Sequence, residues 1–377
     1  MIYFDNGSTT RVSDVVADKM YALLKTQFGN PSSLHSLGFQ AEKELTASRK
    51  IIAAALGVGA EEIYFTSGGT EANNTAVIGT AMAYRSRGTH LITMSIEHPS
   101  VTDSFKYLES KGFQVTYLPV DEKGYVNIQQ LKNAITDKTT LVSIMYVNNE
   151  VGTVQNIEEI ARVIKETKKD CYFHVDCVQA FCKHKIPIKN VDLISVSSHK
   201  IHGPKGVGAL YVRNGVRCES LHFGGGQEKG FRPGTENIAG IVGFACAVEN
   251  SGNLTEKAER VQRVKNTLLE GVMSLENVFV NGDLEKGSPY ILNLSFQDVR
   301  GEVLLHALED KEIYVATGSA CSSKLKKKQK IVDFLVAGRG ENAVRFSFCE
   351  ENTTEQAEKV VQALKELVPV LRKFQPR

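Results

Sequence analysis

The stretch VDLISVSSHKIHGPKG, residues 191–206, joins an apolar run to a polar turn. Its first part, VDLISV, is typical of a buried strand. Two hydroxyl residues, the pair His199-Lys200 and two glycines flanking Pro204 follow at once, and these residue types favour a turn. Lys200 therefore leaves the end of a buried strand on a turn, where bulk solvent is not its obvious surroundings.

Apolar runs of this kind continue along the sequence in both directions, from about residue 40 to about residue 250. Short apolar runs occur at 90–96, 141–147, 171–176, 192–196 and 208–212. Helical patterns separate them, such as IEEIARVIKETKK, which follows a capping-box start at Asn156 and Glu159. Uniformly apolar strands between helices predict an α/β protein with a mostly parallel sheet covered on both faces. In such sheets, ligands bind beyond the carboxyl ends of the strands.

After a long helical stretch at 254–275 the pattern changes. The runs NVFVNG, YILNLSF and NAVRFSF are typical of strands, and they alternate with helical patterns at 302–310 and 354–368. These elements predict a smaller α+β domain. We expect a large domain over residues 14–255, and a small domain formed by residues 1–13 and 256–377.

The composition narrows the classes of function. Of 377 residues, 45 are basic and 43 acidic, so no overall charge favours direct binding of nucleic acid or a membrane, and a small-molecule partner is expected. The apolar run at 238–248 is too short to span a bilayer, and the first ten residues lack the pattern of a signal peptide. Seven scattered cysteines fit a reducing compartment, and their spacing contains no zinc motif. We expect a cytoplasmic protein without a bound metal.

Polar residues follow the apolar runs at the predicted ligand-binding edge. Gly68, Gly69 and Thr70 open a helix, which suits a phosphate group, although an ordinary glycine loop with a threonine cap would look the same. The other strand ends carry His98, Asn149, Asp176 with Gln179, and the group from Ser197 to Lys200.

One ligand would use all these groups, namely pyridoxal phosphate (PLP). Its aldehyde forms a Schiff base with a lysine amine, and its pyridine nitrogen needs a carboxylate to stay protonated. Lys200 and Asp176 would supply these two groups. A buried Asp-Lys ion pair is the alternative, but it does not explain the predicted phosphate-binding residues Gly68, Gly69 and Thr70, called here the phosphate seat.

The motifs resemble, in order and spacing, those of cysteine desulfurases of the iron-sulfur assembly and nitrogenase type. They run from residue 2 to about residue 365: YFDNGSTT, FGNPSSLHSLG, TSGGTEANN, EHPSV, VNNEVGTVQ, HVDCVQA, SSHKIHGPKGVGALYV, GGGQEKGFRPGTEN, GSACSS and VRFSF. The resemblance implies a PLP-dependent transferase of fold type I, in the aminotransferase class V group. It further implies a large domain with a mostly parallel seven-stranded sheet, a smaller α+β domain and a homodimer.

The resemblance also implies roles for individual residues. Lys200 resembles the Schiff-base lysine, Asp176 the partner of the pyridinium nitrogen, and His98 the histidine stacked on the cofactor ring. Arg345 resembles the arginine that binds the substrate carboxylate. The remaining matches are Asn149 and Gln179 for the ring hydroxyl side, with Asn149 also near the substrate; Gly69, Thr70, Ser197 and His199 for the phosphate; Thr235 for the phosphate of the other subunit; and Asn30 for a place near the substrate.

The reaction depends on Cys321, which lies in a Gly/Ser-rich segment with lysines nearby that favour its thiolate. The resemblance makes Cys321 the nucleophile that takes sulfur from L-cysteine as a persulfide, with alanine as the product. Its loop, expected at about 316–335, resembles the long and mobile type that delivers sulfur to an iron-sulfur scaffold or a tRNA thiolation enzyme. We expect Lys200 to move the Cα proton and His98 to carry a proton at the substrate thiol.

Two departures from the family and two alternatives remain. The segment at 324–330 is unusually rich in lysine, and Ser8 stands where the family more often has alanine. A transaminase or selenocysteine lyase on the same scaffold would share most of these residues, although a transaminase does not need Cys321. A non-catalytic binding module is disfavoured because the reactive residues are all present.

Overall fold

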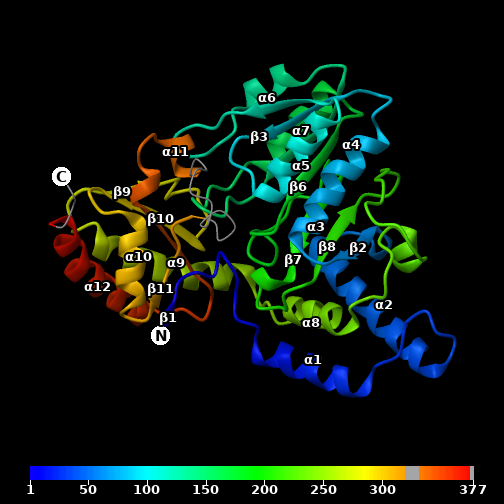
Figure 1. Ribbon diagram of the computed structural model, residues 1–377, viewed down its shortest axis with the longest axis horizontal. Coiled ribbons are helices and arrows are strands. Elements are labelled where there is room, and N and C mark those ends of the chain that lie inside the picture. Colours follow the sequence, from blue (N-terminus) through cyan, green and yellow to red (C-terminus); the bar gives the residue numbers. More distant parts are fainter. Residues whose placement is uncertain (319–330, 374–377) are drawn as a thin grey trace.

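The structure is a computed structural model that describes residues 1–318 and 331–373. The chain forms a large and a small lobe, and the first and last described residues lie in the small lobe (Figure 1). Cys321 and the lysine-rich segment at 324–330 lie outside the described residues.

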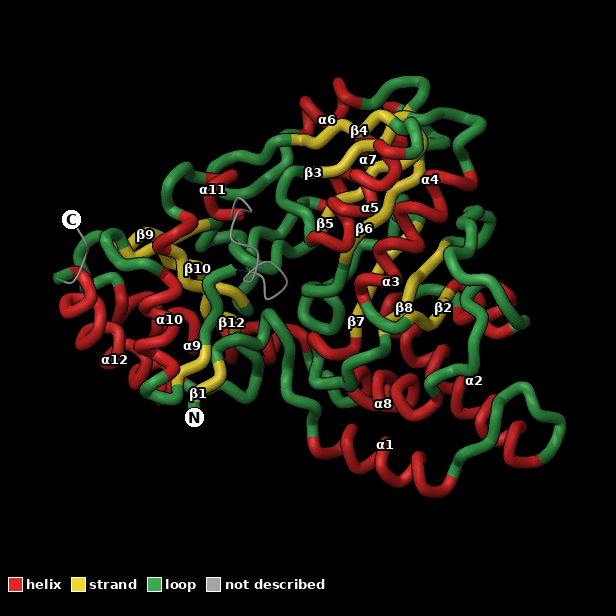
Figure 2. The backbone as a smooth tube through the Cα atoms, viewed as in Figure 1, coloured by secondary structure: helices red, strands yellow, loops and turns green. Residues whose placement is uncertain are grey.

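The large lobe is built on a seven-stranded sheet with the strand order β2-β8-β7-β6-β5-β3-β4 (Figure 2). Only β8 runs against its neighbours β7 and β2, because the other pairs are parallel. The predicted α/β class with a mostly parallel sheet is therefore confirmed. The strands are β2 (Ile63–Thr66), β3 (His90–Met94), β4 (Gln114–Leu118), β5 (Thr139–Met145), β6 (Tyr172–Asp176), β7 (Leu193–Ser197) and β8 (Gly208–Val212).

Helices cover both faces of this sheet because successive strand residues are apolar. Ile92 and Val142 belong to one core cluster, which includes side chains of α1, α2, α7 and α8, whereas Leu91 and Leu141 pack against α4 and α5 on the other face. The helices of this lobe are α1 (Asp14–Thr26), α2 (Ser36–Leu56), α3 (Gly69–Asn74), a π-helical turn (Thr75–Gly79), α4 (Thr80–Ala83), α5 (Pro99–Ser110), α6 (Ile128–Ala134), α7 (Ile157–Thr167) and α8 (Ile238–Glu249).

The small lobe has a separate apolar core. Its antiparallel sheet has the order β12-β10-β9, and a two-residue strand at the N-terminus, β1, pairs with β11. Phe4 packs into this core, so the N-terminal segment belongs to the small lobe. The elements are β1 (Ile2–Tyr3), α9 (Leu254–Val272), β9 (Val278–Asn281), β10 (Ile291–Phe296), α10 (Gly301–Glu309), β11 (Ile313–Tyr314), α11 (Ile331–Leu335), β12 (Ala343–Ser347) and α12 (Thr354–Arg372). The exact bounds of the two domains, 14–255 and 1–13 with 256–377, stay a prediction.

The local predictions hold in most details. Thr353 and Gln356 form the predicted capping box of α12. At α7 the Asn156 side chain accepts from the Glu159 backbone N–H, but the reciprocal half of the predicted capping box is missing, because Glu159 instead binds the Asn156 amide. Within the described residues, no helix has both the length and the hydropathy to cross a membrane.

Candidate active site

A cavity of about 160 Å³ lies at the carboxyl ends of β6 and β7, where the large lobe meets the N-terminal segment and β12. This is the edge at which the sequence predicts ligand binding. Most of the predicted site residues line the cavity: Gly69, Thr70, His98, Asn149, Asp176, Gln179, Ser197, His199, Lys200 and Arg345.

Lys200 reaches the cavity from a short 3₁₀ turn (Ser198–Lys200) that directly follows β7. Its Nζ donates hydrogen bonds to the backbone oxygens of Gly7 (2.6 Å) and Ser8 (2.7 Å). Gln179 donates to the Gly7 oxygen as well, at 2.8 Å. The N-terminal segment therefore forms one wall of the cavity and holds the lysine amine there.

Asp176 ends β6 and is buried, with 3 % of its surface exposed. Its Oδ1 accepts from the Val178 N–H (2.9 Å) and its Oδ2 from the Asn73 amide (2.7 Å). Burial raises the pKa of Asp176, although these hydrogen bonds and the nearby His98 and Lys200 oppose the rise. A cationic ligand group beside Asp176 would stabilise the ionised carboxylate. Asn73 was not predicted, although it lies within the TSGGTEANN motif.

His98 caps the N-terminus of α5. Its Nδ1 accepts from the Ser100 N–H at 3.1 Å and lies 2.7 Å from the Ser100 hydroxyl. Because Nδ1 is an acceptor, a neutral His98 ring carries its proton on Nε2. The preceding residue, Glu97, is fully buried and accepts from the Met145 N–H (2.6 Å); burial raises its pKa well above the usual range, and Asp176 adds to the rise.

The predicted phosphate seat lies at the start of α3. Gly69 has no room for a side chain, since a Cβ there would lie 2.7 Å from Val178 Cγ2. His199 Nδ1 lies 3.1 Å from the Thr9 hydroxyl. Burial, with help from the charge of Lys200, lowers the pKa of His199 to about 3. His199 is therefore neutral at pH 7 and offers a hydrogen bond rather than a charge.

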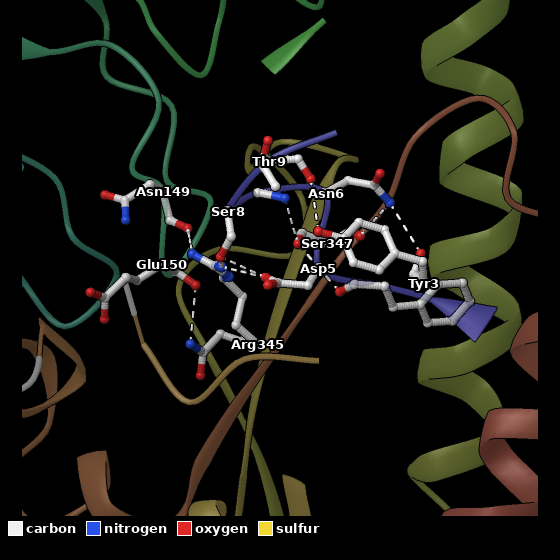
Figure 3. A network of polar contacts seen from close by, with 12 residues as sticks. Tyr3, Asp5, Asn6, Ser8, Thr9, Asn149, Glu150, Arg345 and Ser347 are labelled. Atoms are coloured by element: carbon white, nitrogen blue, oxygen red, sulfur yellow. Dashed lines mark hydrogen bonds and ion pairs between the residues drawn. The ribbon is translucent and has the colours of Figure 1, made fainter. Parts of the chain in front are cut away.

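Arg345 lies on β12 in the small lobe and lines the cavity. Figure 3 shows its polar contacts. Its side chain is only 1 % exposed. One terminal nitrogen donates to the Asn149 backbone oxygen (2.8 Å), and the other to Asp5 Oδ1 (2.7 Å) and Ser8 Oγ (2.6 Å). A ligand carboxylate would therefore compete with Asp5 and Ser8 for the guanidinium group. Neither residue was predicted for the site, although both belong to the YFDNGSTT motif.

The unpaired polar atoms around the cavity test whether PLP fits. In the described part of the chain, four buried polar atoms of lining residues lack a hydrogen-bonding partner: Ser197 Oγ, Asn149 Oδ1, Asn73 Oδ1 and Arg345 Nε. Buried polar groups normally find partners, so such atoms indicate a missing polar ligand. A phosphate seat, a lysine amine and a buried carboxylate in one cavity fit PLP.

Three predicted site residues are not brought to the cavity. Asn30 is exposed, and its Oδ1 accepts from the Ser32 N–H (2.9 Å). Thr235 is also exposed and absent from the cavity lining, and its predicted role concerns the other subunit. Cys321 lies outside the described residues. The roles of these three residues stay predictions.

The other cysteines are mostly buried, as the sequence indicates for Cys171, Cys177, Cys182, Cys246 and Cys349. Cys218 was predicted to be a surface thiol, and this prediction is wrong. Its residue is only partly exposed, its Sγ donates to the Thr75 oxygen (3.1 Å), and burial raises its pKa to about 12. Packing against the π-helical turn explains the difference.

Comparisons with known proteins agree with this geometry. The family model described as aminotransferase class-V matches residues 2–360. A protein of Clostridium botulinum named cysteine desulfurase IscS is 41 % identical, with 100 % of this chain and 96 % of the relative covered. A solved structure titled NifS-like protein has a TM-score of 0.92 at 38 % identity, covering 98 % of this chain and 99 % of that chain. Another, titled SspA in complex with cysteine, has a TM-score of 0.82 at 34 % identity and covers 93 % and 99 %.

The fold and the cavity together define a transferase of PLP fold type I, with a lysine and a carboxylate at neighbouring strand ends. The chain belongs to the aminotransferase class V family, as the match over almost its whole length shows.

Proposed function

We propose that this chain is a PLP-dependent cysteine desulfurase that converts L-cysteine to L-alanine and passes the sulfur to Cys321. The observation that carries the proposal is the single cavity shared by Lys200, Asp176, His98 and Arg345. The relatives named cysteine desulfurase and the structure titled as a cysteine complex support the choice of reaction and of substrate.

The cavity residues would hold PLP at three points. Lys200 would bind the aldehyde carbon, and Asp176 would bind the protonated pyridine nitrogen. Asn149 and Gln179 would lie on the ring hydroxyl side, with His98 against the ring face. The phosphate would be bound by Gly69, Thr70, Ser197 and His199, and in a homodimer by Thr235 of the other subunit.

When bound, PLP supplies an electron sink for the electrons released at the substrate Cα. Arg345 binds the substrate carboxylate and so fixes the orientation of the Cα–H bond. The Lys200 amine removes the Cα proton as a general base. Because its Nδ1 accepts a hydrogen bond from the Ser100 N–H, His98 holds its proton on Nε2. We expect this Nε2 to exchange the proton with the substrate thiol. Asn30 and Asn149 would complete the substrate side of the cavity.

Cys321 carries out the sulfur transfer. Its thiolate attacks the sulfur of L-cysteine, so that an S–S bond forms as the Cβ–S bond breaks. The electron pair of the broken bond stays on the carbon fragment, which takes up a proton at Cβ, regains a proton at Cα from Lys200 and leaves as alanine. We propose that the segment containing Cys321 then carries the persulfide to an acceptor protein in the cytoplasm, such as an iron-sulfur scaffold or a tRNA thiolation enzyme.

Peptide mass spectrometry tests this function. PLP-loaded protein is incubated with L-cysteine without reductant, and we expect one extra sulfur on Cys321 and alanine in equal amount. The matched control is Cys218→Ser, which replaces a thiol outside the cavity and should keep the Cys321 modification. Full alanine production by Cys321→Ala would contradict the proposed role of Cys321, whereas consumption of L-cysteine without formation of alanine would favour a transaminase.

A further inference from the structure

A second group of reactive side chains lies outside the cavity described above. His202, Cys349 and Glu350 each offer one metal-binding atom, and the three atoms lie within 4.8 Å of one another. His202 follows the turn that carries Lys200, whereas Cys349 and Glu350 follow β12, which carries Arg345. This cluster, called here the interlobe cluster, joins the large lobe to the small lobe.

The ring of His202 is fixed in one orientation. Its Nδ1 lies 3.0 Å from the backbone oxygen of Arg11, and since a carbonyl only accepts, Nδ1 carries a hydrogen. Its Nε2 is buried and makes no hydrogen bond within the part of the chain that the structure describes, but it lies 3.8 Å from the Glu350 carboxylate oxygen Oε2. Metal-binding histidines share this arrangement, with one nitrogen donating to a carbonyl and the other facing the metal.

The backbone of His202 is strained as well. Its φ of 63° lies in the left-handed region, which is costly for a residue other than glycine, and its N–H is held by the Thr10 hydroxyl at 2.7 Å. The fold therefore maintains an unfavourable conformation in order to place this ring beside Cys349 and Glu350.

The carboxylate of Glu350 divides its two oxygens between two neighbours. Oε1 pairs with Lys257 Nζ at 2.8 Å, whereas Oε2 faces His202 Nε2 at 3.8 Å. Oε2 is thus placed to bind a metal while Lys257 orients the carboxylate. The side chains of His202 and Glu350 are 12 % and 27 % exposed, so an ion can enter from solvent, although Cys349 is buried.

Other titratable groups face the interlobe cluster. Lys183 is fully buried, and burial lowers its pKa to about 8, against the opposing effect of Glu350 and Cys349. The Tyr290 hydroxyl is buried without a partner among the described residues, and burial raises its pKa, with Glu350 and Cys349 adding to the rise. The groups around the cluster are Cys182, Lys183, Lys257 and Tyr290.

We propose that His202 Nε2, Cys349 Sγ and Glu350 Oε2 form a binding site for a zinc ion, with water as the fourth ligand. One sulfur, one nitrogen and one oxygen donor suit a borderline-soft ion that prefers four ligands. Hard cations such as Mg²⁺ and Ca²⁺ prefer sites made of oxygen ligands. The bound zinc would link the loop after Lys200 to the strand of Arg345 and so fix the two lobes relative to each other.

Zinc would compete with protons at this site. Binding of zinc displaces into solvent the protons that its nitrogen and sulfur ligands would otherwise hold, with no change of oxidation state. The affinity for zinc should consequently rise with pH.

The test uses PLP-loaded protein with the change Cys321→Ser, so that the proposed catalytic thiol does not bind metal. The protein is treated with a chelator, incubated with zinc alone, desalted, and analysed for zinc by mass spectrometry. Cobalt loading in a parallel sample reports thiolate ligation through a sulfur-to-cobalt charge-transfer band. We expect about one zinc ion per chain and a visible cobalt-thiolate band.

Three further changes in the same background locate the site. Cys349→Ser should abolish the cobalt-thiolate band and the retained zinc, and Glu350→Gln should weaken zinc binding at least about tenfold. Cys246→Ser, which replaces a buried thiol in α8, should change neither result. Absence of retained zinc, or equal binding by Cys349→Ser and Cys246→Ser, would overturn the proposal. If Cys349→Ser does not fold, absence of the thiolate band before any change at Cys349 would also overturn it.

Discussion

Asp176 is the last residue of β6, and a single substitution can remove its charge without changing its size. Asp176→Asn keeps the size of the side chain but removes the negative charge that would hold a pyridinium proton. We expect desulfurase kcat to fall at least about 100-fold while PLP remains bound, since the charge acts on the reaction more than on binding. Steady-state kinetics and the absorbance of bound PLP measure the two effects separately.

The control for this change is Asp170→Asn, because Asp170 is exposed and forms an ion pair with Lys168 away from the cavity. It should leave kcat unchanged. Loss of PLP rather than of turnover in Asp176→Asn would contradict the proposed role of Asp176.

Ser8 gives a second prediction, because its hydroxyl accepts a short hydrogen bond from Arg345. Ser8→Ala removes an acceptor that competes with the substrate carboxylate. We expect KM for L-cysteine to fall about 3- to 10-fold with little change in kcat, in line with the strength of hydrogen bonds to charged groups. Steady-state kinetics provide the measurement, and Ser110→Ala, on the exposed face of α5, is the matched control. A rise in KM would mean that Ser8 positions Arg345 instead.

Most residues of the cavity could be predicted because they directly follow apolar runs in the sequence. Asn73, Asp5 and Ser8 could not, since their importance comes from contacts with Asp176 and Arg345, which are far away in the chain. The interlobe cluster could not be predicted either, because His202 and Cys349 are far apart in the chain and show no metal-ligand spacing.

Among the elements, β8 shows how closely the strands approach the phosphate seat. A Cβ on Gly208 would lie 2.6 Å from the Val196 oxygen and 2.8 Å from Gly68, and both contacts are with backbone atoms. Gly208→Ala should therefore lower the free energy of unfolding by about 1–3 kcal/mol and weaken PLP binding, because the sheet and the glycine loop must both shift.

Urea unfolding with and without PLP measures both effects. Gly226→Ala is the control, since no described atom lies within 4 Å of the added methyl group and its φ is −84°. An unchanged unfolding free energy in Gly208→Ala would contradict the close packing of β8.

The elements themselves were largely predictable because β5, β6, β7 and β8 are rich in buried apolar residues and α7 and α12 have clear helical periodicity. Strand ends differed from the predicted ranges by at most two residues, and β8 matches its predicted range of 208–212. The pair β1 and β11 was not predicted, since two residues are too few to show an alternating pattern.

At the scale of the whole molecule, the interlobe cluster should make stability depend on pH. His202 has a folded pKa of about 10, against about 6.5 for an unfolded histidine, so its stabilising effect is complete below about pH 6.5 and is lost as the pH rises towards 10. Glu350 has a lowered pKa, so its contribution is present above about pH 4.5 and is lost in acid. Burial lowers the pKa of Lys183 from 10.5 to about 8, so Lys183 acts in the opposite direction: the free energy of unfolding rises as the pH increases from about 8 to about 10.5.

The contribution of His202 can be isolated with His202→Asn, because asparagine tolerates a positive φ better than most residues. Unfolding free energies are measured in the presence of a chelator, which excludes bound metal. We expect the difference from the unmodified protein to be largest near pH 6 and to shrink steadily up to pH 10. A difference that does not vary with pH would contradict the charge pairing.

The cavity draws on both ends of the chain, since Gly7 and Ser8 hold Lys200 while Arg345 arrives on β12. During synthesis the large lobe can fold as soon as its sheet has left the ribosome, because domains generally fold as units from the N-terminus. Its ligand-binding edge, however, lacks Arg345 until β12 has been made. A nascent chain that stops before β12 is therefore unable to bind substrate in the proposed way, and competence for catalysis arises only after this strand has left the ribosome.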